Sequence, residues 1–260
     1  MIWSLAVAVL AGACAGAVVS MMRGGHQKIV RIVAAAIVFV IIYSAGRRWI
    51  VRPHEASAQM AEVPAFREIE KADPATYALI KNELVRAMDS GADHSAVQGR
   101  IHAAATLLVR KYIPRASDAA VRRYITVTVD EIEQLREKNP AVAAAVLFPK
   151  PGTFIDINPY LSDATKQEDM TALAELVRSG AAAQGPPGDA ETDRADELLQ
   201  DLIQPLLQKY GADIQMLSNP YAPDTDPQKL CAMIVDLYRA VLALPEHDSA
   251  VVLRKLVTSA

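Results

Sequence analysis

Two kinds of residue that often stabilise or activate small domains are scarce in this chain. Its 260 residues include only two cysteines, Cys14 and Cys231, which provide neither a disulfide framework nor the cysteine spacing of a metal site. Aromatic residues make up 5% of the chain, whereas alanine is abundant. Because aromatic residues favour strands and alanine favours helices, this composition predicts an all-α fold.

The short motifs that mark common catalytic and cofactor sites are also missing. The chain contains no GxxxxGK[ST], GxGxxG, GxSxG, HExxH or CxxC pattern. His94 and His102 are eight positions apart, whereas a helical metal site prefers histidines four positions apart. Glu131 and Glu133 are two apart on an expected helix, so they point in different directions and do not form an acid–base pair. We therefore predict no catalytic residue, no cofactor and no metal site.

Acidic residues are absent from residues 1–54, which contain six lysines and arginines. Uncharged apolar stretches fill residues 2–22 and 32–46, and the first is long enough, at about 1.5 Å per helical residue, to cross a bilayer core. We interpret residues 1–52 as a transmembrane helical hairpin. The alternative is a cleaved signal peptide with its cleavage site near Ala13-Cys14-Ala15, but no basic residue precedes the apolar stretch.

Small residues recur at every fourth position of the first apolar stretch. They are Ala8, Gly12, Gly16 and Ser20. In a bilayer, such a face lets two helix backbones approach closely, so it predicts packing against the other arm of the hairpin or against a second copy of the chain. The alternative is that an Ala/Gly-rich stretch produces this spacing by chance.

This interpretation makes the chain an integral protein of the membrane, in a bacterium the inner membrane, with the lipid bilayer as one partner. The basic residues do not decide its orientation, because three lie between the two apolar stretches and three follow the second. The Arg47-Arg48 pair directly after the second stretch favours a cytoplasmic body.

The remainder of the chain is acidic. From residue 55 onward there are 27 − 6 = 21 basic residues and 30 acidic residues, a net charge of −9. Nucleic-acid binding requires an excess of lysine and arginine, so we predict no nucleic-acid partner.

Helix-start signals divide this acidic body into seven or so amphipathic helices, which predict a helical bundle in two lobes. Helices are expected to begin at Asp73-Pro74, Ser117-Asp118, Asn139-Pro140 and Asp226-Pro227. The strand-like run at 125–129 is expected to stay helical, because the charged residues on both sides continue the helical period. We predict a stalk at residues 53–73, a first lobe at 74–178, a Gly/Pro-rich linker at 179–192 and a second lobe at 193–260.

Three surfaces of the body are candidates for binding. The apolar faces of residues 198–207 and 230–241 either contact a partner or bury each other. The third is a possible basic contact patch formed by Arg110, Lys111, Arg115, Arg122 and Arg123. Its alternative is a solvated face paired with Asp118, Asp130 and Glu131.

The function predicted from these features is a membrane-anchored helical protein-interaction module, a subunit or adaptor of a membrane-associated assembly. One alternative is an immunity- or defence-type binding protein. A second is an enzyme with a site built from scattered polar residues, which would show as a pocket in which groups with shifted pKa values converge.

Overall fold

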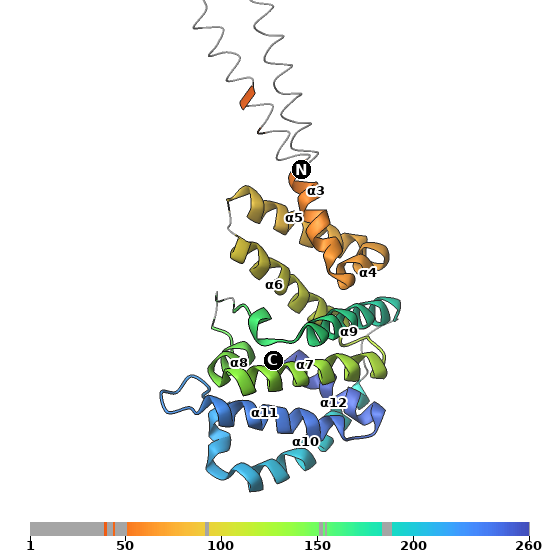
Figure 1. Ribbon diagram of the computed structural model, residues 1–260. Helices are drawn as coiled ribbons and strands as arrows, with labels where there is room; N and C mark the ends of the chain where they lie inside the picture. The colour runs from red at the N-terminus through yellow and green to blue at the C-terminus, as the bar shows by residue number, and fades with distance from the viewer. Residues whose placement is uncertain are drawn as a thin grey trace, which may run out of the picture. The chain divides into compact units, whose positions relative to one another are not determined.

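The computed structural model describes residues 51–91, 94–150, 153, 155–183 and 189–259, together with the single positions 39, 40 and 44. Every secondary-structure element that spans several of these residues is an α-helix or a short 3-10 helix, which confirms the all-α prediction (Figure 1).

The prediction of an integral membrane protein is wrong for this part of the chain. None of the helices formed by the described residues combines the length and the apolar character that crossing a bilayer requires. Of the predicted hairpin at residues 1–52, only positions 39, 40, 44, 51 and 52 are described. The small-residue face, Ala8, Gly12, Gly16 and Ser20, lies outside the described residues.

Residue contacts divide the chain into two compact units, at boundaries other than the predicted ones. The first unit comprises Met1–Glu62 and Ala78–Arg100, and it includes α3 (Arg52–Glu62) and most of α5 (Pro74–Asp89). The second unit comprises Val63–Tyr77 and Ile101–Ala260. The helix α6 (His94–Tyr112) begins in the first unit and ends in the second.

The second unit contains most of the helices. They are α4 (Pro64–Ala72), α7 (Asp118–Lys138), α8 (Pro140–Leu147), α9 (Asp163–Ala182), α10 (Asp189–Tyr210), α11 (Pro227–Leu242) and α12 (Glu246–Ser259), with 3-10 helices at η2 (Asn158–Tyr160) and η3 (Gly211–Leu217). The central helix is α7, which packs against α8, α9, α11 and α12. Figure 1 shows α9, α7, α11 and α10 stacked in that order.

The predicted helix starts are confirmed, and each uses a polar side chain to bind an otherwise unpaired backbone N–H. Ser117 accepts from the amide of Ala120 at 3.4 Å, and Asn139 accepts from Val142 at 3.2 Å. Asp226 accepts from the amide of Gln228 at 2.9 Å. A side-chain cap of this kind stabilises a helix by about 1 kcal/mol.

The strand-like run at 125–129 is helical, as predicted. Val127 and Val129 of α7 are buried. The hydroxyl of Thr126 donates to the Arg122 carbonyl at 2.8 Å, and that of Thr128 donates to the Tyr124 carbonyl at 3.0 Å. Burial of the valines and these hydrogen bonds offset the weak helix propensity of β-branched residues.

The stalk prediction for residues 53–73 is wrong where α4 is concerned. Phe66 and Ile69 of α4 are fully buried, and α4 packs against α9. Seen alone, the segment is mixed polar with two prolines, because its apolar residues occupy only one face of a short helix. That face is part of the core because α9 covers it.

The predicted linker at 179–192 begins too early. Residues 179–182 form the last turn of α9, and α10 begins at Asp189. A Cβ atom at Gly180 would lie 2.6 Å from the Tyr112 carbonyl oxygen, so only glycine allows this close approach of α9 to the end of α6. The neighbouring Ser179 hydroxyl accepts a hydrogen bond from the Ser117 amide at 2.7 Å. Residues 179 and 180 therefore belong to a closely packed contact between α9 and the residues at the end of α6, and not to a linker.

Candidate functional site: an apolar groove beside α8 and α11

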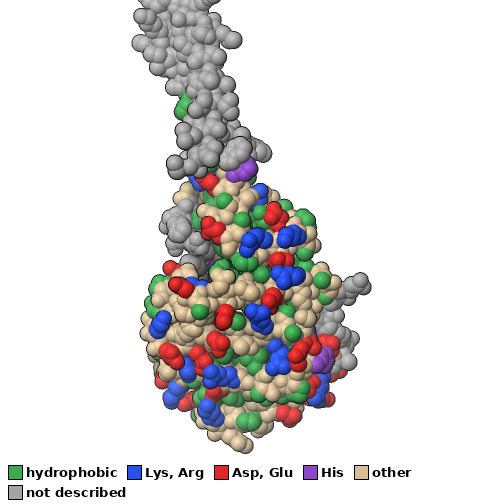
Figure 2. Space-filling view, turned by 45° about the vertical axis from the view of Figure 1, so that its right-hand side comes forward, with side chains coloured by type: hydrophobic (Ala, Val, Ile, Leu, Met, Phe, Trp, Pro, Cys, Tyr) green, Lys and Arg blue, Asp and Glu red, His purple; other side chains and the backbone are tan. Residues whose placement is uncertain are grey.

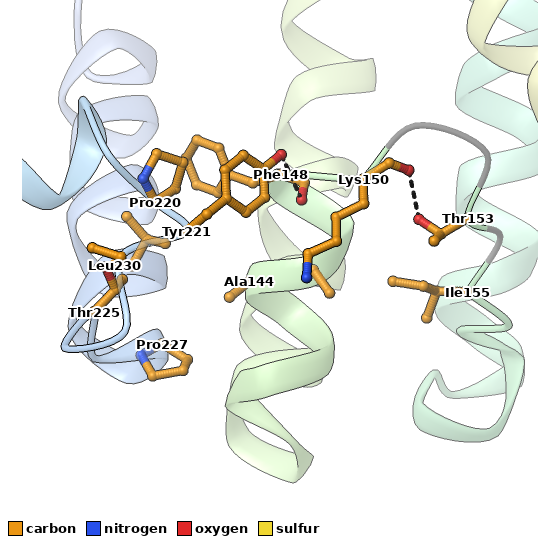
Figure 3. Close-up of a pocket in the computed structure, with 12 residues that line it drawn as sticks. Ala144, Phe148, Lys150, Thr153, Ile155, Pro220, Tyr221, Thr225, Pro227 and Leu230 are labelled. Carbon is orange, nitrogen blue, oxygen red and sulfur yellow. Dashed lines mark hydrogen bonds between the residues drawn. The ribbon is translucent and has the colours of Figure 1, made fainter.

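A groove with a volume of about 550 Å³ lies in the second unit, between α8 and the segment that leads into α11. Figure 3 shows residues from three parts of the chain facing it: Ala144 from α8, Phe148 and Ile155 from the segment after α8, and Tyr221 and Leu230 from around the start of α11. Most of these side chains are apolar, so the groove suits an apolar side chain of a ligand.

Hydrogen bonds hold the two loops that form the walls of the groove. The Tyr221 hydroxyl lies 3.2 Å from the Phe148 carbonyl oxygen and 3.3 Å from that of Pro149, and it donates to this pair (Figure 3). The Thr153 hydroxyl donates to the Lys150 carbonyl at 2.6 Å. The Thr225 hydroxyl donates to the Asn219 carbonyl at 3.2 Å. The hydroxyl groups are thus engaged in shaping the groove.

A small apolar cluster packs against Ala144 of α8, which also lines the groove. Its fully or nearly fully buried members are Leu135, Ala143, Leu161 and Cys231. Burial raises the pKa of the Cys231 thiol to about 11, although Arg136 acts in the opposite direction. The thiol is therefore protonated and unreactive at neutral pH, and Cys231 acts as a core residue.

Lys150 is the one charged side chain among the described residues that line the groove. It is exposed, and within the described part of the chain no carboxylate pairs with it. Figure 3 shows the side chain extending across the groove toward Ala144. An apolar cavity with an ammonium group at its edge is complementary to a ligand that carries an apolar group and a carboxylate.

Three of the five residues of the predicted basic contact patch are engaged by other groups of the protein. Arg123 donates from Nη1 to both carboxylate oxygens of Glu175 at 2.7 Å, whereas Arg122 donates to the Leu242 carbonyl at 2.9 Å. Lys111 pairs with Asp73 of the segment before α5. The remaining two patch residues, Arg110 and Arg115, are exposed.

Pairing therefore accounts for three of the five patch residues, but with partners other than those expected. Asp118 instead binds Arg254 at 2.6 Å and His247 at 2.8 Å. On the face shown in Figure 2, Lys/Arg and Asp/Glu side chains are interspersed. The arrangement matches a solvated, ion-paired face better than a basic docking site.

The apolar face of residues 230–241 is core, since Leu230, Met233 and Val241 are buried. The apolar face of residues 198–207 is buried at one end and partly exposed at the other. Leu198 is buried, whereas Ile203 and Leu207 remain 40% and 39% exposed.

A pair of acidic residues that the sequence did not indicate lies between α7 and α9. The two helices are joined at Arg123–Glu175 and, three turns further along α7, by a 2.6 Å hydrogen bond from Gln134 to Thr165. These contacts place Glu131 opposite Asp169. Burial and the nearby Asp169 carboxylate raise the pKa of Glu131 to about 8, and burial raises that of Asp169 to about 6.

Glu131 and Asp169 do not line the groove at α8 and α11. Glu133, two positions along α7 from Glu131, pairs with Arg239 of α11. The groove and the shifted carboxyl groups are therefore separate features of the second unit.

The groove itself could not be recognised from the sequence. In the sequence, the loops that form it are two stretches rich in turn residues, at 149–159 and 218–227. Nothing local in either stretch indicates that the Tyr221 hydroxyl reaches the carbonyl of Phe148, 73 positions away. Comparison of the chain with protein-family models, with curated proteins and with solved structures found no match.

Proposed function

We propose that the protein is a helical protein-interaction module, and that the groove at α8 and α11 binds a segment of a partner protein. The observation that supports this proposal is Lys150, an unpaired cation beside an apolar groove. The bound segment inserts an apolar side chain between Ala144 and Tyr221 and places a carboxylate on Lys150.

The described residues that line the groove suit binding better than catalysis. They include no carboxylate, histidine or cysteine that would act as a general base or a nucleophile. The carboxyl groups with raised pKa values among the described residues, Glu131 and Asp169, belong to the α7–α9 contact. Protein binding therefore accounts for the composition of the groove, and the net negative charge of the body favours a protein over a nucleic-acid partner.

Photo-crosslinking from the groove tests the proposal. Tyr221 is replaced by p-benzoylphenylalanine in the full chain, and the crosslinked segment is identified by mass spectrometry. We expect one defined partner segment that carries an acidic residue near an apolar one. Ala145→Trp fills the groove and should abolish the crosslink, whereas Ala141→Trp on the exposed part of the same helix should leave it intact. Crosslinks that survive Ala145→Trp would show that binding does not involve the groove.

A further inference from the structure

A second, smaller groove lies between α4 and α9, and its chemistry is opposite to that of the first. Its volume is about 340 Å³. Arg67, Glu68 and Lys71 line it from α4, and Glu175 and Arg178 line it from α9. Whereas the first groove is apolar with one charge, this groove is dominated by charged side chains.

Both acidic residues of this α4–α9 groove are already paired. Arg178 binds Glu68 in a bidentate manner, with Nε 3.1 Å from one carboxylate oxygen and Nη2 3.0 Å from the other. Glu175 accepts two hydrogen bonds from Arg123 at 2.7 Å. The hydrogen bond from Arg178 is the main cause of the lowered pKa of Glu68, and the charges of Lys71 and Arg67 act in the same direction.

Two cations are left over. Arg67 and Lys71 are exposed, and no carboxylate among the described residues lies within ion-pair distance of either. They are four positions apart on α4, so they project from the same side of the helix. With Arg123 included, four bases face two acids here, a local excess of two positive charges in a body that carries −9.

We propose that the α4–α9 groove binds an acidic segment of a partner protein, with carboxylates on Arg67 and Lys71. The apolar walls, Pro64 and Ala174, accommodate the aliphatic parts of such a segment. A nucleic acid is a poorer fit, because a long polyanion extends beyond two unpaired cations onto a body of net negative charge. The inference does not depend on the first groove, with which it shares no residue.

The probe is a fluorescein-labelled, 12-residue alanine peptide with glutamates four positions apart, titrated with the full chain in low salt and followed by fluorescence anisotropy. We expect it to bind, and a peptide with glutamine at the same positions to bind at least roughly tenfold more weakly. Equal binding of the two peptides, or equally effective competition by inorganic phosphate or a single-stranded oligonucleotide, would overturn the proposal.

Variants locate the binding. Arg67→Glu combined with Lys71→Glu should weaken the glutamate peptide roughly tenfold, and the milder Arg67→Gln with Lys71→Gln should act in the same direction. The matched control is Arg100→Glu with Arg110→Glu, which changes the net charge equally at exposed positions outside the groove. This control should leave the affinity within about twofold. Equal weakening by the control would mean that only long-range charge is involved.

Glu68→Gln gives a change in the opposite direction. It removes the carboxylate that occupies Arg178, which lies 61% exposed, so the groove gains a third available cation. The glutamate peptide should bind about threefold more tightly. A purely structural role of the Glu68–Arg178 pair predicts no tightening, and that result would contradict the inference.

Discussion

The two sides of α7 differ in what they bury. On the side of α8 and α11, the contact is an apolar cluster around Leu135 and Cys231, and the groove with Lys150 lies next to this cluster. On the side of α9, Glu131 and Asp169 face each other, and beyond α9 lies the charged α4–α9 groove. The helix α7 thus makes an apolar contact on the side of α8 and α11. On the side of α9 it makes a contact whose stability depends on the protonation of Glu131 and Asp169. Of these two contacts, the one with α9 should therefore be the more sensitive to pH.

The largest expected effect tests whether α4 belongs to the α9 side at all. Phe66→Ala removes a fully buried aromatic side chain, so it should lower the free energy of unfolding by about 3–5 kcal/mol. Arg67→Ala, one position along and exposed, should change it by less than about 0.5 kcal/mol. Urea unfolding followed by circular dichroism measures both. If α4 were a solvated stalk, the two variants would be equally stable.

The next effect concerns the contact between α9 and α6. In an open helix, Gly180→Ala would stabilise the protein, because alanine is the better helix former by about 1 kcal/mol. Here the new Cβ would lie 2.6 Å from the Tyr112 carbonyl oxygen and 2.8 Å from its Cβ. Backbone atoms on both sides must shift, so we expect a loss of about 1–3 kcal/mol. Thermal unfolding gives the sign of the change in stability. A gain would indicate an open helix at Gly180, and a loss would indicate the close contact with Tyr112.

The pH prediction separates the two sides of α7 most clearly. The native pKa values of Glu131 and Asp169, about 8 and about 6, lie above their ordinary values of 4.5 and 3.8. Between the ordinary and the native values the native state holds more protons than the unfolded state, so stability should fall as the pH rises from about 4 to 8.

Glu131→Gln cannot lose this proton and should flatten that fall, by on the order of 1 kcal/mol between pH 5 and pH 8. Glu133→Gln is the control, because Glu133 lies two positions along on the same helix and pairs with Arg239 of α11. It should keep the wild-type slope. Unfolding curves at several pH values that are parallel for all three proteins would contradict the account of the α9 side.

The smallest effect lies at the first groove. Tyr221→Phe removes the hydroxyl that bonds the Phe148 and Pro149 carbonyl oxygens but keeps the ring. Since Tyr221 is 55% exposed, the cost in stability should be about 0.5 kcal/mol. Hydrogen exchange should nevertheless speed up at the amides of Phe148 and Lys150, because this end of the loop has lost the hydrogen bond from Tyr221. No change in exchange would show that the hydroxyl does not hold the groove.

The sequence predicted what depends on neighbours along the chain. Ser117, Asn139 and Asp226 start helices because a side-chain oxygen reaches an amide two or three residues later, and such contacts are visible in a sequence. The helical state of residues 125–129 followed from the charged residues on both sides.

What the sequence could not predict depends on residues that are distant along the chain. Phe66 is core only because α9 covers it, and Glu131 meets Asp169 only because α7 and α9 pack together. The groove combines loops more than 60 positions apart. The prediction of an integral membrane protein depended on residues 1–52, whereas the described helices lie almost entirely beyond them.

The most direct test of the central claim is a charge exchange at Lys150. The segment identified by crosslinking is synthesised with its acidic residue as glutamate or as lysine, and both peptides are titrated against the wild type and Lys150→Glu. We predict that Lys150→Glu weakens the glutamate peptide about five- to tenfold and that the lysine peptide recovers most of this loss on the variant. Affinities that change by the same factor for both peptides would mean that Lys150 does not contact the acidic residue, and the claim that this groove recognises a partner segment would fail.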